Sequence, residues 1–149
     1  MSRELVFDAL TVRVGRDVDE MAREAAVEAA AVVRGAIADR GEANVMLATG
    51  NSQLVFLGEL VKIPDIRWDA VRAFHMDEYV GLPHSHSASF QRYMRERVAA
   101  RVPFPEFHYL SGDAPDAELE ATRYESLLRA HALALCCAGI GENGHLPFN

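Results

Sequence analysis

Apolar residues recur along the chain in two rhythms, one typical of helices and one typical of buried strands. Between positions 17 and 41 they follow helical spacing, with Asp17 and Glu20 arranged as a capping box and Gly41 as the stop. Apolar runs with strand character lie at 44–48, 71–76, 107–110 and 132–138, and alternating positions at 5–14 predict an edge strand or hairpin. Amphipathic stretches predict further helices at about 52–62, from Ser87 or Ser89 to about residue 100, and at 116–131.

Strands and helices therefore alternate throughout the chain. This alternation predicts an α/β fold, with a doubly wound, mainly parallel, Rossmann-like sheet and helices on both faces. Residues 1–149 contain no repeat, low-complexity segment or long linker, which favours a single α/β domain.

Polar segments marked by glycine follow three of the predicted strands, at 49–52, 77–81 and 139–145. Because the carboxyl ends of parallel strands meet at one edge of a sheet, we expect these segments to converge there. In open α/β sheets this edge is where ligands bind.

The composition of the chain argues against nucleic acids and membranes as binding partners. Half of the residues are hydrophobic and a quarter are charged, and the formal charge of −7 argues against sequence-independent nucleic-acid binding. No apolar stretch reaches membrane-spanning length, so we expect no membrane partner. Cys136 and Cys137 are neighbours in a predicted strand and point to opposite faces, which disfavours a mutual disulfide and indicates a reducing cytoplasm.

The segment 49–52 contains Thr49, Gly50, Asn51 and Ser52 between a strand and a helix. Gly50 permits a tight turn, and the side-chain hydroxyls and free N–H groups at the helix start can cradle a phosphate. Helix capping by Asn51 or Ser52 explains the same residues without a ligand.

The segment 75–79 places two adjacent acids, Asp77 and Glu78, at a strand end. Proximity of like charges and desolvation raise the pKa of an inward-facing carboxyl, which suits proton removal beside a carbonyl. The alternative is a solvated turn in which both acids face water. His75 has period-two spacing from Asp77, which allows the two to share a face, but packing alone also explains a strand histidine.

The segment 139–145 contains the most residues with candidate chemical roles. Its glycines allow a ligand to approach the backbone, and His145 can carry protons near neutral pH beside Glu142 and Asn143. His84 and His86 have ligand-like spacing, but their Pro- and Ser-rich loop gives no rigid geometry, so we predict no metal site.

Three segments together resemble glucosamine-6-phosphate deaminase/isomerase: 48–52 (ATGNS), 76–82 (MDEYVGL) and 139–149 (GIGENGHLPFN). The resemblance implies a sugar-phosphate enzyme of amino-sugar metabolism that needs no cofactor and converts glucosamine 6-phosphate to fructose 6-phosphate and ammonia. It implies that His145 assists opening of the pyranose ring and that Asp77 moves a proton between C2 and C1. Asn143 would be the third catalytic residue, and Glu78, Gly144 and the segment 49–52 would bind the substrate.

Two residues depart from the pattern of this family. Asn143 stands where many members carry aspartate, and a neutral amide orients the imidazole of His145 but stabilises its charged form less. Pro147 stands where a smaller residue is more usual and stiffens the segment.

The resemblance also implies further strands and helices, another catalytic acid and a basic phosphate ligand beyond Asn149. We therefore expect 1–149 to be truncated at its C-terminus, with an open sheet edge, exposed apolar helix faces and poor activity alone.

Three other functions fit the same residues. They are another sugar-phosphate isomerase, a hydrolase like the related 6-phosphogluconolactonases, and a non-catalytic sugar-phosphate sensor. The presence of both Asp77 and His145 favours an enzyme. The family also includes oligomers, so a homo-oligomer is compatible with the resemblance.

Overall fold

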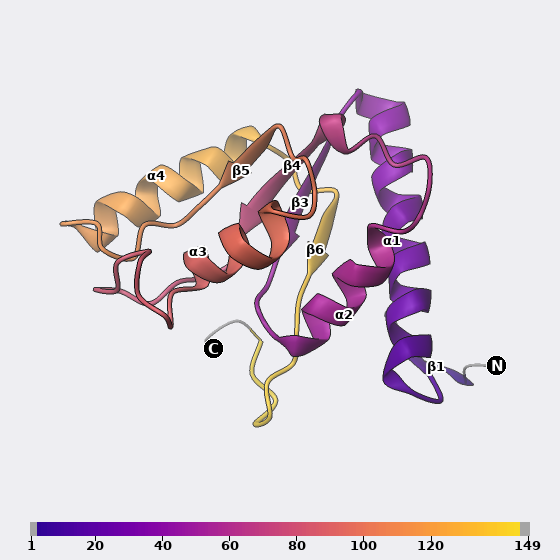
Figure 1. Cartoon of the computed structure of the whole chain (residues 1–149). Helices are drawn as coiled ribbons and strands as arrows, with labels where there is room; N and C mark the ends of the chain where they lie inside the picture. Colours follow the sequence, from indigo (N-terminus) through magenta and orange to yellow (C-terminus); the bar gives the residue numbers. More distant parts are fainter. Residues whose placement is uncertain (1–2, 147–149) are drawn as a thin grey trace.

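A computed structural model describes residues 3–146 of the chain, and a parallel four-stranded sheet forms its centre (Figure 1). The spatial order is β5-β4-β3-β6, and the strands are β3 (Ala43–Leu47), β4 (Val71–His75), β5 (Glu106–His108) and β6 (Leu135–Cys137). Leu47 pairs with both His75 and Cys137, so the three inner strand ends lie level with one another. The predicted α/β fold with a parallel Rossmann-like sheet is confirmed.

The first two strands form a separate antiparallel hairpin rather than an edge of the main sheet. They are β1 (Arg3–Phe7) and β2 (Leu10–Val14), and the turn between them includes Asp8 at a φ of 52°. The hairpin expected at 5–14 is therefore confirmed.

The long helix α1 (Val18–Arg40) has the ends that its sequence predicts. The carboxylate of Asp17 accepts the backbone N–H of Glu20 at 2.7 Å. At the other end Gly41 adopts a φ of 80° and donates its N–H to the carbonyl of Ile37. A residue with a side chain would be strained in that left-handed conformation, so Gly41 ends the helix.

One face of the sheet is covered by α1, α2 (Asn51–Leu60) and η2 (Met94–Ala99). The buried core on this face combines small side chains of α1 with larger ones from the other elements: Ala26, Ala29, Ala30, Val33, Val45, Leu47, Phe56, Leu57, Val71, Ala73, Met94 and Val98. The alanines of α1 let α2 approach closely, because they remove bulk from the helix–helix contact.

The helix expected from Ser89 to about residue 100 is divided in the structure. Ser89 caps a four-residue α-helix, α3 (Phe90–Tyr93), which continues as the π-helical segment η2. A short 3₁₀ turn, η1 (Trp68–Ala70), also precedes β4 and was not predicted. Apolar periodicity gives the extent of a helix but does not distinguish these hydrogen-bonding patterns.

The opposite face of the sheet is covered by α4 (Ala117–Ala130), as Figure 1 shows. The buried Tyr124 packs against Phe74 and reaches the backbone at the ends of two strands. Its hydroxyl accepts the N–H of His75 at 2.8 Å and lies 2.6 Å from the carbonyl of His75 and 3.1 Å from that of His108. Tyr124 thus continues the hydrogen bonding of the β4–β5 pair beyond its last backbone contact.

The path of the chain reverses beside β3. From β3 it proceeds outward to β4 and β5, and α4 then carries it across the sheet to β6 on the other side of β3. Such a reversal leaves a crevice at the carboxyl ends of the strands where ligands bind.

The other side of β6 has no neighbouring strand among residues 3–146. Val27 of α1 and Ile140 beyond β6 are 61% and 80% exposed, so apolar side chains face solvent in the described part of the chain. Cys136 and Cys137 are free thiols. Within the same residues, none of the helices combines the length and the apolar character that a membrane span requires.

Candidate active site

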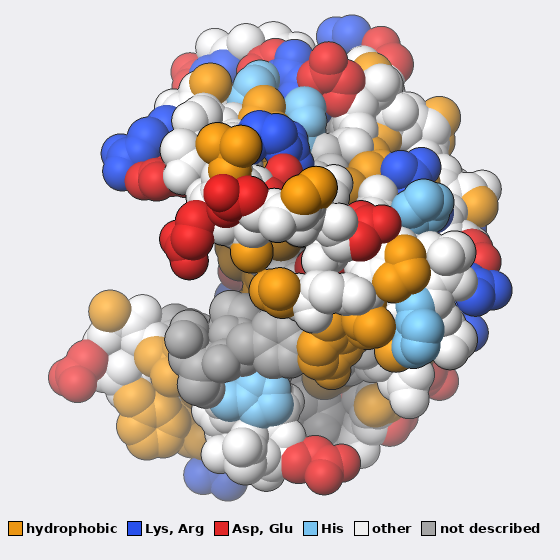
Figure 2. All heavy atoms as spheres, turned by 90° about the vertical axis from the view of Figure 1, so that its left-hand side faces the viewer, with side chains coloured by type: hydrophobic (Ala, Val, Ile, Leu, Met, Phe, Trp, Pro, Cys, Tyr) orange, Lys and Arg blue, Asp and Glu red, His pale blue; other side chains and the backbone are white. Residues whose placement is uncertain are grey.

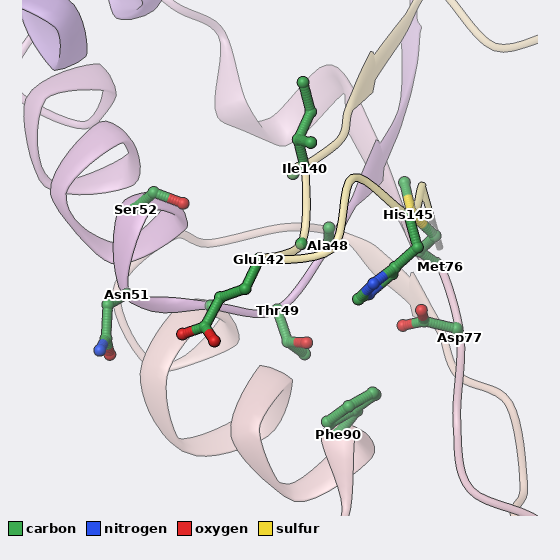
Figure 3. Close-up of a pocket in the computed structure, with 13 residues that line it drawn as sticks. Ala48, Thr49, Asn51, Ser52, Met76, Asp77, Phe90, Ile140, Glu142 and His145 are labelled. Atoms are coloured by element: carbon green, nitrogen blue, oxygen red, sulfur yellow. The ribbon is translucent and has the colours of Figure 1, made fainter. Parts of the chain in front are cut away.

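The three polar segments converge on one pocket at the carboxyl edge of the sheet, as the sequence predicts (Figure 3). The pocket has a volume of about 490 Å³. Its lining comes from the turns after β3, β4 and β6 and from the start of α3: Ala48, Thr49, Gly50, Asn51, Ser52, Met76, Asp77, Phe90, Gly139, Ile140, Gly141, Glu142 and His145.

The turn after β3 presents the start of α2 to this pocket. Gly50 has a φ of 130° and stands at the N-cap position without a side-chain hydrogen bond to the helix. Asn51 and Ser52 lie inside the first turn, so neither acts as the N-cap residue. The hydroxyl of Tyr93 donates to the carbonyl of Gly50 at 2.8 Å and ties this turn to α3. A helix start without a side-chain cap leaves N–H groups that can bind an anion.

Asp77 occupies the turn after β4, and its carboxylate points into the pocket toward the ring of His145 (Figure 3). Burial raises the pKa of the Asp77 carboxyl, the negative charge of Glu78 raises it further, and His145 acts in the opposite direction. One carboxylate oxygen, Oδ1, is buried and has no hydrogen-bond partner among the described residues. Such a carboxylate has an unused acceptor and a raised proton affinity, as a general base requires.

His145 stands opposite Asp77 and is oriented by its own turn. Its Nδ1 contacts Oδ1 of Asn143, and because an amide oxygen only accepts, this contact requires the hydrogen on Nδ1, which in the neutral ring leaves the lone pair on Nε2. The imidazole lies against Gly141, where an added Cβ would overlap the ring. Gly144, at a φ of 82°, donates to the carbonyl of Gly141 at 2.9 Å and closes the turn.

The other predicted site residues lie outside the lining of the pocket. Asn143 contacts the imidazole of His145, and Gly144 closes the turn that carries it. Neither residue is among those that line the pocket. Glu78 also lies outside that lining, because its carboxylate is directed onto the start of α3. His75 is fully buried, and burial lowers the pKa of its imidazole to about 4, so the ring is neutral at pH 7.

Sequence reasoning did not predict a role for Phe90, which forms one wall of the pocket below Asp77 (Figure 3). Its neighbour Ser89 was a candidate helix cap, but capping says nothing about which tertiary surface the next side chain covers. Gln53 was also missed, and its amide donates to the carbonyl of Ala138 at 3.4 Å, connecting α2 to the segment after β6.

No lysine or arginine lines the pocket within residues 3–146, so a bound phosphate would depend on N–H groups of the turns. The molecule is notched on the face that Figure 2 shows, and acidic and basic side chains are interspersed there. No cluster of three histidine, cysteine or acidic residues within the described chain could hold a metal ion. Pro147, Phe148 and Asn149 lie outside the described residues.

Comparison with known proteins places this arrangement in a family. Residues 16–147 match the model of the family described as glucosamine-6-phosphate isomerases/6-phosphogluconolactonase. The chain belongs to this family. A glucosamine-6-phosphate deaminase from an Exiguobacterium species is 42% identical over 103 residues, which are 69% of this chain and 40% of that protein. The chain thus spans less than half the length of the curated relatives that it matches.

Solved structures share the fold of this family member. A monomeric glucosamine-6-phosphate deaminase superimposes with a TM-score of 0.77 at 24% identity, over 89% of this chain and 56% of that one. A 6-phosphogluconolactonase from Plasmodium vivax gives a TM-score of 0.80 at 10% identity, over 96% of this chain and 52% of that one. At these identities the likeness concerns the fold alone.

Proposed function

We propose that the pocket binds an amino-sugar phosphate and that the chain provides the deaminase/isomerase chemistry for converting glucosamine 6-phosphate to fructose 6-phosphate and ammonia. The observation that carries this proposal is the position of Asp77 and His145, which face one another across a pocket that an uncapped helix start also enters. The curated deaminases among the relatives support the choice of substrate.

The first chemical step in this proposal is opening of the sugar ring. Nε2 of His145 has its lone pair available, because Nδ1 holds its hydrogen against Asn143. The imidazole can therefore take the proton of the anomeric hydroxyl and return it to the ring oxygen as the C1–O bond breaks. The product is an open-chain aldehyde in which the hydrogen on C2 is acidic.

The second step is proton transfer between adjacent carbons. The Asp77 carboxylate removes the C2 proton to give an enolamine and then protonates C1, which leaves an imine at C2. Addition of water to that imine releases ammonia and gives the ketose, so one water is consumed for each ammonia formed. The raised pKa of Asp77 makes it a stronger base for the first half of this transfer, and the carboxyl then holds the proton that it returns to C1.

The test combines turnover with binding. Because the chain spans less than half the length of its relatives, 1–149 with glucosamine 6-phosphate is expected to release ammonia only slowly, and Asp77→Asn should abolish this release while binding persists. Binding is read from the amide NMR signals of residues 49–52. Asp39→Asn is the matched control, since Asp39 is exposed near the end of α1. Unchanged 49–52 signals at millimolar substrate would contradict the proposed phosphate cradle.

The lactonase and sensor alternatives give different results in the same experiment. A 6-phosphogluconolactonase-like hydrolase would form acid from a lactone and release no ammonia, whereas another isomerase would form a ketose alone. A sensor would bind the sugar phosphate without any turnover, and Asp77→Asn would change nothing.

The same proposal extends to the cellular setting. Free thiols at Cys136 and Cys137 suit the reducing cytoplasm, where sugar phosphates are metabolised. Light scattering of the purified chain would show whether it assembles into a homo-oligomer.

A further inference from the structure

Glu78 is the most heavily hydrogen-bonded acidic residue next to the pocket. Its Oε1 accepts the N–H of Tyr79 at 2.9 Å and of Phe90 at 3.0 Å. Its Oε2 accepts the hydroxyl of Ser89 at 2.7 Å and the N–H of Gln91 at 2.7 Å. Ser89 and Gln91 are both buried, so much of this network is shielded from water.

These contacts join the turn after β4 to the start of α3. Ser89 itself caps the helix by accepting the N–H of Arg92 at 3.2 Å, so Glu78 and Ser89 together satisfy the first N–H groups of α3. Burial alone raises the pKa of the Glu78 carboxyl, but the N–H groups of Gln91 and Phe90 and the hydroxyl of Ser89 outweigh it. Because its pKa is lowered overall, Glu78 is ionised at neutral pH.

The network determines where Phe90 lies. Its N–H is bonded to Glu78, its ring packs against Tyr79 with a centroid distance of 4.9 Å, and its side chain lines the pocket next to Asp77 (Figure 3). A change at Glu78 would therefore move a wall of the pocket without removing any group from the pocket itself.

The network also holds a negative charge in the turn that contains Asp77. The titratable groups around the Asp77 carboxylate are Glu78 in its own turn and His145 and Glu142 in the turn after β6. The start of α3 contributes the apolar Phe90, and the turn at 49–52 contributes no charge. Glu78 follows Asp77 directly in the sequence, and its hydrogen bonds hold its carboxylate at the start of α3.

We propose that Glu78 is a positioning residue: it holds α3 against the turn of Asp77, keeps Phe90 in the pocket wall and holds a fixed negative charge in that turn. This inference deepens the proposed function and rests on its assignment of Asp77 as the base. It also changes the role expected of Glu78, from substrate contact to organisation of the contacts around the base.

The experiment measures the proton affinity of Asp77 directly. The side-chain carboxyl carbons of 1–149 are labelled with ¹³C and titrated by NMR, with Asp77→Asn used to assign the signal. In Glu78→Gln, which keeps the size of the side chain and removes its charge, the pKa of Asp77 should fall by about one unit. Glu125→Gln is the matched control, because Glu125 is exposed on α4 and pairs with Arg129; it should leave the Asp77 titration unchanged.

Two more variants separate charge from structure. Glu78→Asp keeps the charge but shortens the reach to α3, so it should keep most of the raised pKa of Asp77 and shift the NMR signals of Phe90. Ser89→Ala removes the helix cap and leaves the charge in place, so it should also leave the Asp77 titration nearly unchanged. If Ser89→Ala lowered the pKa of Asp77 as much as Glu78→Gln, a structural role alone would explain the data and the proposal would fail.

The pKa values of Asp77 and Glu78 in the wild-type chain test the proposal even if Glu78→Gln does not fold. Asp77 must titrate above an ordinary aspartate and Glu78 below an ordinary glutamate, and the reverse order would overturn the proposal. These titrations need no turnover, so they can succeed where ammonia release fails, and the two proposals are tested separately. Where turnover is measurable, the acidic limb of the pH–rate profile should move to lower pH in Glu78→Gln, because the base becomes weaker.

Discussion

Replacing Tyr124 with phenylalanine should destabilise the sheet although it removes a single oxygen atom. The ring stays in place against Phe74, so the buried apolar area is unchanged. The loss falls on the backbone of His75, whose N–H and carbonyl both use the hydroxyl, at 2.8 and 2.6 Å. Each buried polar group left without a partner costs about 1–3 kcal/mol, so we expect a loss of about 2–4 kcal/mol.

For a chain of this size that loss corresponds to a fall in Tm of about 5–15 °C. The assay is urea and thermal unfolding of Tyr124→Phe followed by circular dichroism at pH 7. Tyr109→Phe is the matched control, since Tyr109 stacks on Phe107 and its hydroxyl makes no hydrogen bond within residues 3–146. A change below about 0.5 kcal/mol for Tyr124→Phe, or an equal change in the control, would refute the bridging role of the hydroxyl.

Three other predictions concern the site and its support. Asn143→Ala removes the acceptor that keeps the hydrogen on Nδ1 of His145, so ¹⁵N shifts of labelled histidine should show the Nε2–H tautomer increasing; an unchanged tautomer would exclude orientation by the amide. Gly141→Ala should displace the imidazole and reduce turnover at least tenfold with the fold retained, whereas Gly35→Ala, in open space on α1, should stabilise the chain by about 0.5–1 kcal/mol. Burial lowers the pKa of His75 from 6.5 to about 4, so the neutral ring adds its full contribution to the unfolding free energy above pH 6.5. This contribution is lost as the pH falls toward 4, by about 3 kcal/mol in total. Unfolding free energies measured at pH 7 and pH 5 should differ by about 2 kcal/mol of this total, and His75→Gln should reduce the difference.

The features that the sequence predicts well depend on short-range signals or on strand polarity. Asp17 and Gly41 mark the ends of α1 because a cap needs only its own side chain or its own φ. The convergence of Asp77, His145 and the segment 49–52 follows from the parallel direction of the strands. Neither inference requires knowledge of how distant side chains pack.

The features that the sequence does not predict depend on packing between distant segments. The sequence pattern places Asp77 and Glu78 side by side after a strand, but it does not show which one enters the pocket. That choice follows from the start of α3, which offers its N–H groups to Glu78 and places Phe90 beside Asp77. The bridge from Tyr124 to His75 joins α4 to β4, and no periodic pattern contains it.

The reversal of strand order beside β3 has a consequence for how the chain acquires its site during synthesis on the ribosome. Strands β3, β4 and β5 emerge in the order in which they pair, so most of the sheet can form as the chain appears. β6 must pair with β3 across a large sequence separation, and loop closure makes such contacts slow. His145 follows β6, so the nascent chain carries Asp77 and the turn at 49–52 before it carries the histidine that faces them. The two sides of the pocket are therefore complete only once β6 has joined the sheet.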